Sequence, residues 1–264
     1  DSVGTIDSYF PKTDFFVEFE RFDRHIDKIK REGEKLDYVS ICSPNYLHDS
    51  HIRFGLRQGA DVICEKPLVL NPWNVDALIE LEEEYDNKVH TILQLRHHEA
   101  IMELKEKIAN GPADKVYDID LTYITSRGNW YYTSWKGNEE KSGGIASNIG
   151  VHFFDMLQWI FGPMEESSVD IKTKDTNSGT LQFKQANVKW YLSINADNLP
   201  QKAKNQGLTT FRTLSIEGDD IEFSKGFTDL HTVSYQKILE GNGYGLADAR
   251  NSIEIVSEIR NNNI

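Results

Sequence analysis

Short apolar runs alternate with stretches of helical spacing over the first third of the chain. The runs at 36–42, 62–64 and 88–95 are too short for helices, and they predict buried strands of a parallel sheet. Apolar residues recur every three or four positions around 22–29, over 48–58 and around 75–82, which predicts helices before and between these strands. This order is typical of right-handed βαβ units in a doubly wound sheet.

A different pattern begins after residue 95. One more helix is predicted over 101–108, and another over 148–159. Residues 117–123 and 188–194 alternate strictly between apolar and polar positions, as half-buried strands do, and Gly218-Asp219-Asp220 predicts a hairpin turn between 214–216 and 221–223. We therefore expect an α/β protein with two domains. Residues 1–95 form a Rossmann-type dinucleotide-binding domain, and residues 96–264 form an α+β domain with a large, mostly antiparallel open sheet.

Charge and composition narrow the classes of partner. Acidic residues outnumber basic ones by 42 to 29, a net charge of −13, which argues against binding to nucleic acid because phosphates require a basic face. No apolar run approaches the ~18 residues of a transmembrane helix, and no leader pattern opens the chain, so no membrane partner is expected. The cytoplasm is the expected compartment. Local arginines and lysines can still hold an anionic small molecule in one cleft.

The first candidate site lies where two predicted parallel strands end. Lys66 follows the strand at 62–64, and Pro67 ends the ladder because it has no N–H group to donate. Open α/β sheets bind ligands at this edge, where partial burial lowers the pKa of a lysine. Asn45 and His48 follow the neighbouring strand and open a helix that suits a phosphate or a ribose. Alternatively, Lys66 reaches solvent, Asn45 caps the helix and His48 lies at the surface.

The second candidate site is the segment 143–155. Asn148 and His152 are spaced i and i+4, so a helix places them on one face, and Asp155 is close enough to orient the His152 ring. A histidine held in this way can exchange a proton near neutral pH. The alternative is a core histidine with a purely structural hydrogen bond.

Two further groups have weaker patterns. Arg127 and Trp130 lie in an aromatic loop, where the guanidinium could bind a carboxylate or diphosphate and the indole could stack on a ring. Alternatively, the loop forms part of a dimer interface. The pairs His48/His51 and His97/His98 have no third ligand at short spacing, and the two cysteines do not form a zinc motif, so no metal site is predicted.

Two motifs resemble those of the glucose–fructose oxidoreductase and inositol dehydrogenase family. They are Glu65-Lys66-Pro67 after a sheet strand, and Asn148-Ile149-Gly150-Val151-His152 where the family has Asp-x-Gly-x-His. The runs 37–45, 94–98 and 125–130 resemble one branch, which oxidises the 3-hydroxyl of UDP-N-acetylglucosaminuronic acid to make precursors of bacterial lipopolysaccharide and O-antigen.

The resemblance implies an NAD-dependent sugar-nucleotide dehydrogenase, with NADH reoxidised by 2-oxoglutarate. Lys66 and His152 would be catalytic, with His152 as base and Lys66 polarising the oxygen, or with these roles reversed. The resemblance also implies the binding residues. NAD would lie along Ser43, Pro44, Asn45, His48, Glu65, Lys66 and Gln94. The sugar nucleotide would bind at Arg96, Arg127, Trp130, Asn148 and His152, with Gln94 as a further candidate for binding the uronate. A free sugar or polyol as substrate, or a non-catalytic protein that binds sugar nucleotides, remains an alternative. The open sheet predicts a homodimer or homotetramer.

The sequence departs from the family pattern at two places. Asn148 replaces the usual aspartate, so a carboxylate that could raise the basicity of His152 is absent. No Gly-rich strand and turn for a pyrophosphate is found, and Asp1 is at most a remnant of the ribose-binding position. We expect that the first strand, turn and helix are missing, and that these 264 residues alone bind NAD poorly.

Overall fold

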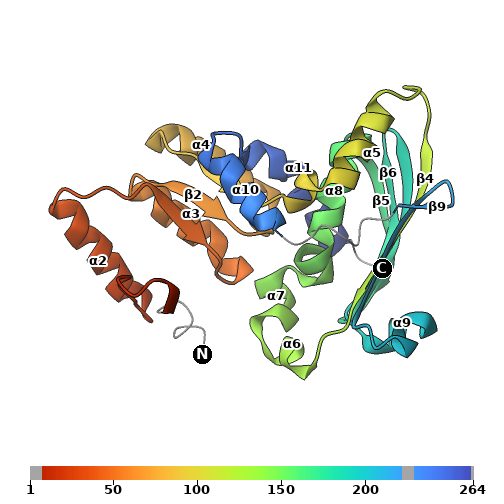
Figure 1. Ribbon diagram of the computed structural model, residues 1–264, viewed down its shortest axis with the longest axis horizontal. Helices are drawn as coiled ribbons and strands as arrows, with labels where there is room; N and C mark the ends of the chain where they lie inside the picture. The colour runs from red at the N-terminus through yellow and green to blue at the C-terminus, as the bar shows by residue number, and fades with distance from the viewer. Residues whose placement is uncertain (1–7, 222–228, 263–264) are drawn as a thin grey trace.

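The molecule contains two sheets with helices between them (Figure 1). The computed structural model describes residues 8–221 and 229–262. The smaller sheet has the strand order β1-β2-β3-β10, in which the first three strands are parallel and β10 is antiparallel to β3. Its strands are β1 (Tyr38–Ile41), β2 (Asp61–Cys64), β3 (Val89–Thr91) and β10 (Tyr244–Gly245). The predicted parallel sheet is confirmed.

Helices α3 (His48–Arg57) and α4 (Pro72–Tyr85) connect the parallel strands in the predicted order, and α2 (Phe19–Arg31) precedes β1. Helices α10 (Leu230–Leu239) and α11 (Leu246–Asn261) follow later in the chain. Gly33 has a positive φ of 90° just after α2, as expected for the glycine that ends a helix. Helix α11 packs on both α4 and α8, so it joins the two halves of the molecule.

The larger sheet has the strand order β5-β6-β7-β4-β8-β9. Only β4 and β7 run parallel, and the other neighbours are antiparallel. The predicted open, mostly antiparallel sheet is therefore confirmed, with one parallel pair at its centre. Its strands are β4 (Tyr117–Thr125), β5 (Met164–Lys172), β6 (Thr176–Phe183), β7 (Ala186–Ser193), β8 (Thr210–Ile216) and β9 (Asp219–Asp220).

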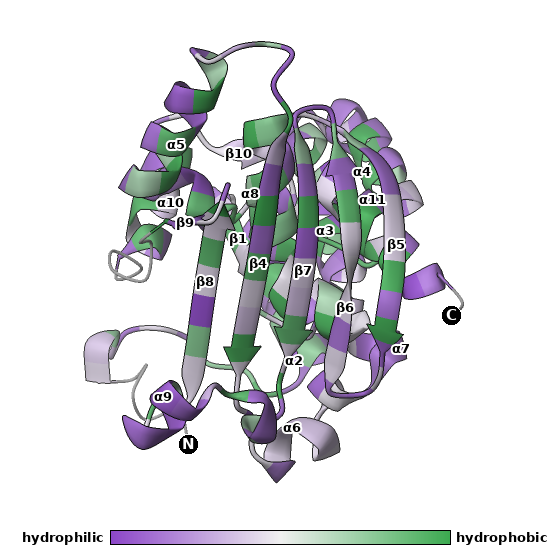
Figure 2. Ribbon diagram, turned by 90° about the vertical axis from the view of Figure 1, so that its right-hand side faces the viewer, coloured by the Kyte–Doolittle hydropathy of each residue, from purple (hydrophilic) through white to green (hydrophobic). Residues whose placement is uncertain are grey.

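One face of this sheet is covered by helices and the other is open. Helices α5 (Glu99–Ala109) and α8 (Val151–Phe161) lie on the inner side (Figure 1), where Phe154 of α8 meets Trp190 of β7 edge to face at 5.5 Å. The outer face has no helix in front of it in Figure 2. The shorter helices α6 (Asn129–Thr133), α7 (Glu139–Ser142) and α9 (Gln201–Asn205) lie at one end of the sheet.

One hydrophobic core runs through both halves. It includes Val62 of β2, Leu78 of α4, Phe154 of α8 and Trp190 of β7, each with no more than 2% of its surface exposed. Burial of these side chains is the main favourable contribution to folding. It also holds the smaller sheet against α8, and the site described below lies between these two elements.

The structure differs from the predicted elements at three places. The strand predicted over 88–95 ends at Thr91, and residues 94–97 form a 3-10 turn. The helix predicted over 148–159 starts earlier, with a π-helical turn at Ala146–Gly150 that continues into α8. In the predicted hairpin the turn is Glu217-Gly218, both with positive φ, and Asp219 already pairs with Ile216. Residues 222–223 of that hairpin and Asp1 lie outside the described residues.

Candidate active site

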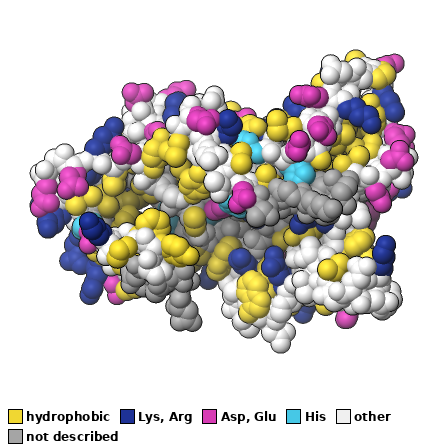
Figure 3. Space-filling view, in the orientation of Figure 1, with side chains coloured by type: hydrophobic (Ala, Val, Ile, Leu, Met, Phe, Trp, Pro, Cys, Tyr) yellow, Lys and Arg dark blue, Asp and Glu magenta, His cyan; other side chains and the backbone are white. Residues whose placement is uncertain are grey.

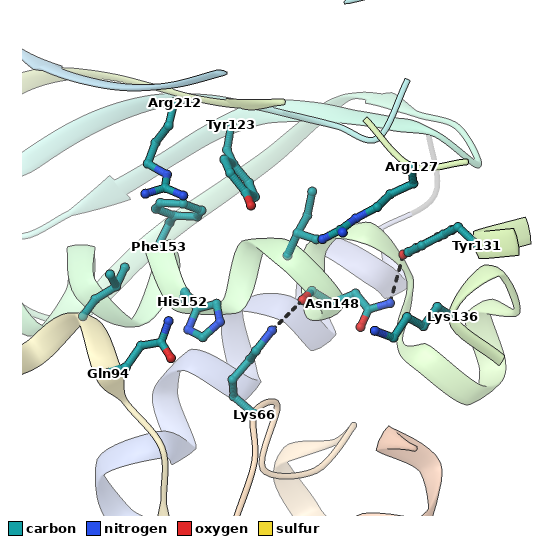
Figure 4. A pocket seen from close by; sticks show the side chains of 12 residues that line it. Lys66, Gln94, Tyr123, Arg127, Tyr131, Lys136, Asn148, His152, Phe153 and Arg212 are labelled. Carbon is teal, nitrogen blue, oxygen red and sulfur yellow. Dashed lines mark hydrogen bonds between the residues drawn. The ribbon is translucent and has the colours of Figure 1, made fainter. Parts of the chain in front are cut away.

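Lys66 lies directly after β2, at the carboxyl edge of the small sheet. The backbone N–H of Glu65 still donates to Ile41 O at 3.0 Å, and the chain then leaves the ladder through a cis Lys66–Pro67 peptide bond. The buried His48 ring holds the next turn, because its Nδ1 lies 2.8 Å from Pro67 O. Lys66 thus starts from a rigid strand end and points away from the sheet toward the second half of the molecule (Figure 4).

Asn148 and His152 reach the same place from the other half of the molecule. The helix that carries them packs tightly on β7, since a Cβ at Gly150 would lie 2.7 Å from both Leu192 and Phe154. A side chain at this position would force Leu192 and Phe154 to move, so glycine suits the close approach. The Lys66 Nζ donates to Asn148 O at 3.0 Å, so the strand end and the helix are in direct contact. The predicted meeting of Lys66 with the Asn148–His152 segment is found in the structure.

A cavity of about 170 Å³ opens between these elements. The Lys66 amine and the His152 ring lie next to each other on one side of it, with Gln94 beside His152 (Figure 4). The described residues that line the cavity are Lys66, Gln94, Leu95, Tyr123, Arg127, Tyr131, Lys136, Asn148, Ile149, His152, Phe153 and Arg212.

The lining is strongly basic although the protein is acidic. Four cationic side chains, from Lys66, Arg127, Lys136 and Arg212, face the cavity, and no carboxylate is among its described lining residues. In the space-filling view, Lys and Arg side chains gather over the segment that carries α6 and α7 (Figure 3). A local positive potential of this kind attracts and orients an anionic ligand. The cavity therefore suits a substrate with carboxylate or phosphate groups.

Burial sets the protonation of the two central groups. It lowers the pKa of Lys66 to about 8, an effect that Glu65 opposes and that Lys136 and Arg127 increase. Burial, together with the positive charge of Lys66, also lowers the pKa of His152 well below its usual value. Near pH 7, Lys66 is thus mostly an ammonium that can donate a hydrogen bond, and His152 is a neutral imidazole that can accept a proton.

Two of the residues expected at the cofactor, Lys66 and Gln94, line the cavity. The others lie outside it, along the carboxyl edge of the small sheet. Asn45 is buried and donates to Ser142 O at 2.8 Å, so it bridges the two halves instead of capping a helix. His48 is not at the surface, because its two ring nitrogens contact Pro67 O and Ser43 O. Glu65 pairs with His231 of α10 at 3.1 Å. Ser43 and Pro44 are half-buried at the end of β1.

Arg96 and Asp155 do not have the expected roles. The 3-10 turn at 94–97 directs Gln94 to the cavity and Arg96 away from it, into a buried pair with Asp155 at 2.7 and 2.9 Å. The Arg96 guanidinium also bonds Asp248 and lies over the Tyr244 ring. Asp155 is therefore committed to Arg96 and does not orient the His152 ring. The expectation that Arg96 binds the substrate is not supported by this geometry.

Replacing Arg96 with methionine is expected to destabilise the fold. The change leaves the Asp155 carboxylate buried without a partner, which costs about 3–5 kcal/mol of unfolding free energy. Arg250→Met is the matched control, because Arg250 makes a similar two-bond pair with Asp76 at an exposed position. Urea denaturation of both variants measures the difference. Equal, small losses would show that the Arg96 pair has no structural role.

Trp130 lies outside the cavity, whereas its neighbours line it. The Trp130 side chain is 51% exposed, and Tyr131 and Lys136 from the same loop face the cavity instead. Sequence reasoning named the loop but not these two residues. It also missed Tyr123 and Arg212, which are paired across β4 and β8. The alternation along β4 placed Tyr123 on the inner face, but no local signal marks Arg212.

A second cavity, of about 270 Å³, adjoins the first at Tyr131 and Lys136. Lys172, Lys174 and Arg260 contribute further positive charge to its lining, and Glu139 contributes one carboxylate. Gly143 and Gly144 also line it, and their backbone N–H groups donate within the protein, to Glu139 O at 2.8 Å and to Ser142 Oγ at 3.1 Å, so the positive charge of this cavity comes from its side chains. This second cavity is therefore also suited to an anion.

Comparison with known proteins identifies the family. Residues 2–93 match the model "Oxidoreductase family, NAD-binding Rossmann fold", and residues 105–200 match "Oxidoreductase family, C-terminal alpha/beta domain". A crystal structure of the WlbA (WbpB) dehydrogenase from Thermus thermophilus with NAD and UDP-GlcNAcA superposes with a TM-score of 0.95. It is 43% identical and covers 99% of this chain and 84% of its own. The chain belongs to the GFO/IDH/MocA oxidoreductase family.

A second structure is similar to the same degree, and two curated relatives are more distant. A second WlbA (WbpB) structure from T. thermophilus, with NAD and alpha-ketoglutarate, is 44% identical at a TM-score of 0.95 and covers 99% of this chain and 84% of its own. The D-glucoside 3-dehydrogenase of Escherichia coli is 26% identical over 48% of this chain and 36% of its own length. The putative oxidoreductase YteT of Bacillus subtilis is 28% identical over 50% of this chain and 31% of its own length. Each match therefore spans about a third of the curated relative.

The described part of the chain has neither a membrane-spanning helix nor a cluster of metal ligands. No helix within residues 8–221 and 229–262 is long and apolar enough to cross a bilayer. The same residues contain no group of three His, Cys, Asp or Glu side chains that could hold a metal ion.

Proposed function

We propose that this oxidoreductase oxidises the 3-hydroxyl of UDP-N-acetylglucosaminuronic acid to the 3-keto sugar with NAD. The observation that carries the proposal is the convergence of Lys66 and His152, from two halves of the molecule, on one basic cavity. The similar WlbA proteins, crystallised with NAD and with UDP-GlcNAcA or alpha-ketoglutarate, support it. Such a product serves the synthesis of lipopolysaccharide and O-antigen precursors in the cytoplasm.

The residues at the edge of the small sheet fit the nicotinamide end of NAD. Gln94 Oε1 is buried and has no hydrogen-bond partner among the described residues, although it lies beside the cavity. An acceptor of this kind suits the amide N–H₂ of a nicotinamide. We propose that Ser43, Pro44, Asn45, His48, Glu65, Lys66 and Gln94 border the bound cofactor, with His48 and Asn45 acting by holding the backbone around it. NAD, when bound, supplies the hydride acceptor.

The protein groups then handle the proton and the developing charge on oxygen. The neutral His152 takes the proton of the 3-hydroxyl, and the Lys66 ammonium donates a hydrogen bond to the same oxygen. The contact with Asn148 O uses one Lys66 N–H and leaves two for the substrate. Arg127, Lys136 and Arg212 hold the uronate carboxylate. The same cations suit 2-oxoglutarate, a dicarboxylate, which we propose as the oxidant that regenerates NAD.

The second cavity favours a sugar nucleotide over a free sugar or polyol. A diphosphate beside the uronate would bring two further negative charges, and Lys172, Lys174 and Arg260 lie where it would extend from the first cavity. Lys172 and Arg260 each bond to only a few protein acceptors, so both keep donors for a ligand. A free sugar would leave this positive charge without a partner.

The test is turnover by the full-length protein, followed as NADH absorbance. We expect hydride transfer from UDP-N-acetylglucosaminuronic acid, inhibition by UDP, and little turnover of free N-acetylglucosaminuronic acid. Preference for the free sugar would favour a sugar or polyol dehydrogenase. Binding without hydride transfer, also in the presence of 2-oxoglutarate, would favour a non-catalytic protein that binds sugar nucleotides.

We also propose that the helix-free outer face of the large sheet pairs with a second copy of the chain. The exposed positions of β4 and β7 alternate with buried ones and so lie on this one face, and a two-fold axis would bring the same surface of a second copy against it. Sedimentation equilibrium of the full-length protein distinguishes a dimer or tetramer from a monomer.

A further inference from the structure

A chain of buried amide and hydroxyl groups connects the small sheet to the aromatic loop. Asn45 at the end of β1 contacts Asn148, and Asn148 contacts the Tyr131 hydroxyl (Figure 4 draws the second contact). The three side chains are 5%, 8% and 3% exposed, so bulk water does not compete for these bonds. In such a chain the direction of each hydrogen bond is decided by its neighbour.

The direction of these hydrogen bonds is fixed at the Asn45 end by a backbone carbonyl. Ser142 O can only accept, so the Asn45 group 2.8 Å from it must be the Nδ2 donor. The same Nδ2 lies 3.4 Å from the Asn148 amide, which must therefore turn its Oδ1 to Asn45. The Asn148 Nδ2 then faces Tyr131 and donates to the hydroxyl oxygen at 2.9 Å. The Tyr131 oxygen is thus an acceptor within the protein.

The hydrogen of the Tyr131 hydroxyl is left for a ligand. No acceptor for it is present among the described residues, and Tyr131 lines both cavities at the point where they join. Burial raises the pKa of Tyr131, so the O–H stays intact at working pH.

We propose that Tyr131 donates a hydrogen bond to an oxygen of the bound sugar nucleotide, and that Asn45 and Asn148 fix this direction. The proposal rests on the function proposed above and adds a recognition residue to it. It also explains why an amide suits position 148. A carboxylate there would accept the Tyr131 hydrogen and leave the substrate oxygen facing a lone pair.

The first test removes the hydroxyl alone. Tyr131→Phe keeps the ring packing, so we expect a stable protein whose KM for the sugar nucleotide rises about ten-fold. The dissociation constant for NADH should stay unchanged, which a general loss of structure would not allow. Tyr132→Phe is the matched control, because Tyr132 is the next residue, is exposed and lines neither cavity.

The second test reverses the direction of the bond without removing a group. Asn148→Asp retains the contact with Asn45 but accepts the Tyr131 hydrogen, and its charge also repels the anionic substrate, so KM should rise by at least the factor seen for Tyr131→Phe. In the Tyr131→Phe background the same change should raise KM less than it does in the wild type, because only the charge repulsion remains and no hydroxyl is left to be turned.

The outcomes separate this proposal from the proposed function. If the wild-type protein turns over the sugar nucleotide but Tyr131→Phe keeps its KM within two-fold, the inference about Tyr131 is wrong and the function stands. Additive effects of the two changes on KM would equally contradict it. If the wild-type protein does not oxidise the sugar nucleotide, the function itself fails.

Discussion

Lys66→Met is expected to lower kcat for sugar oxidation by about 10²–10⁴-fold, the usual contribution of a group that moves or stabilises a reacting proton. The methionine keeps the length and packing of the side chain but removes its N–H donors. The contact with Asn148 O is also lost, so the variant should be checked for an unchanged thermal midpoint. Lys35→Met provides a control at an exposed position between α2 and β1.

The pH profile of the wild-type protein assigns the role of this amine. The lowered pKa of about 8 means that Lys66 loses its proton within the accessible range. If the ammonium polarises the oxygen, kcat/KM falls as pH rises through that value, whereas it rises there if neutral Lys66 is the base. We expect the fall, and we expect Lys66→Met to abolish it. A rise that disappears in Lys66→Met would reverse the roles of Lys66 and His152.

His152→Gln is expected to reduce kcat by about 10²–10⁴-fold, because glutamine fills the space but cannot take the proton from the 3-hydroxyl. The lowered pKa of His152 leaves the imidazole neutral, so wild-type activity should persist to pH values below the ordinary histidine range. The variant should regain activity as pH rises, since hydroxide can replace the missing base.

A matched control for this change is His25→Gln on α2, far from the cavity in sequence and structure. Steady-state kinetics at several pH values, with NADH binding measured separately, identifies the step that is affected. A His152→Gln protein that retains more than a tenth of the wild-type kcat at neutral pH would exclude His152 as the base.

Periodicity predicted much of the fold because burial enforces it locally. Strands β1 and β2 could be predicted from their own apolar residues alone. The alternation at 117–123 was enough to predict which side of β4 faces the core. The parallel pairing of β4 with β7 could not be predicted in this way, because the partners are some seventy residues apart and the register starts at Tyr117 and Ala186. Strand pairing over that distance depends on the whole core.

The site was predictable where it rests on strand and helix ends. Lys66 and His152 could be placed from the end of a buried strand and from helical spacing. Arg96 was misplaced because the 3-10 turn at 94–97 breaks the alternation of a strand and reverses which side chains face the cavity. Arg212 was missed because it reaches the cavity through its pairing with Tyr123, which only the assembled sheet defines.

Transfer of a deuterium label tests the central claim most directly. The full-length protein is incubated with NAD and UDP-N-acetylglucosaminuronic acid that carries deuterium only at C3, and the reduced cofactor is analysed by mass spectrometry after denaturation. The account predicts reduced nicotinamide one mass unit heavier than with unlabelled substrate, and a slower single turnover. Reduced cofactor without the label would contradict it, because the hydride would then have come from another carbon of the sugar.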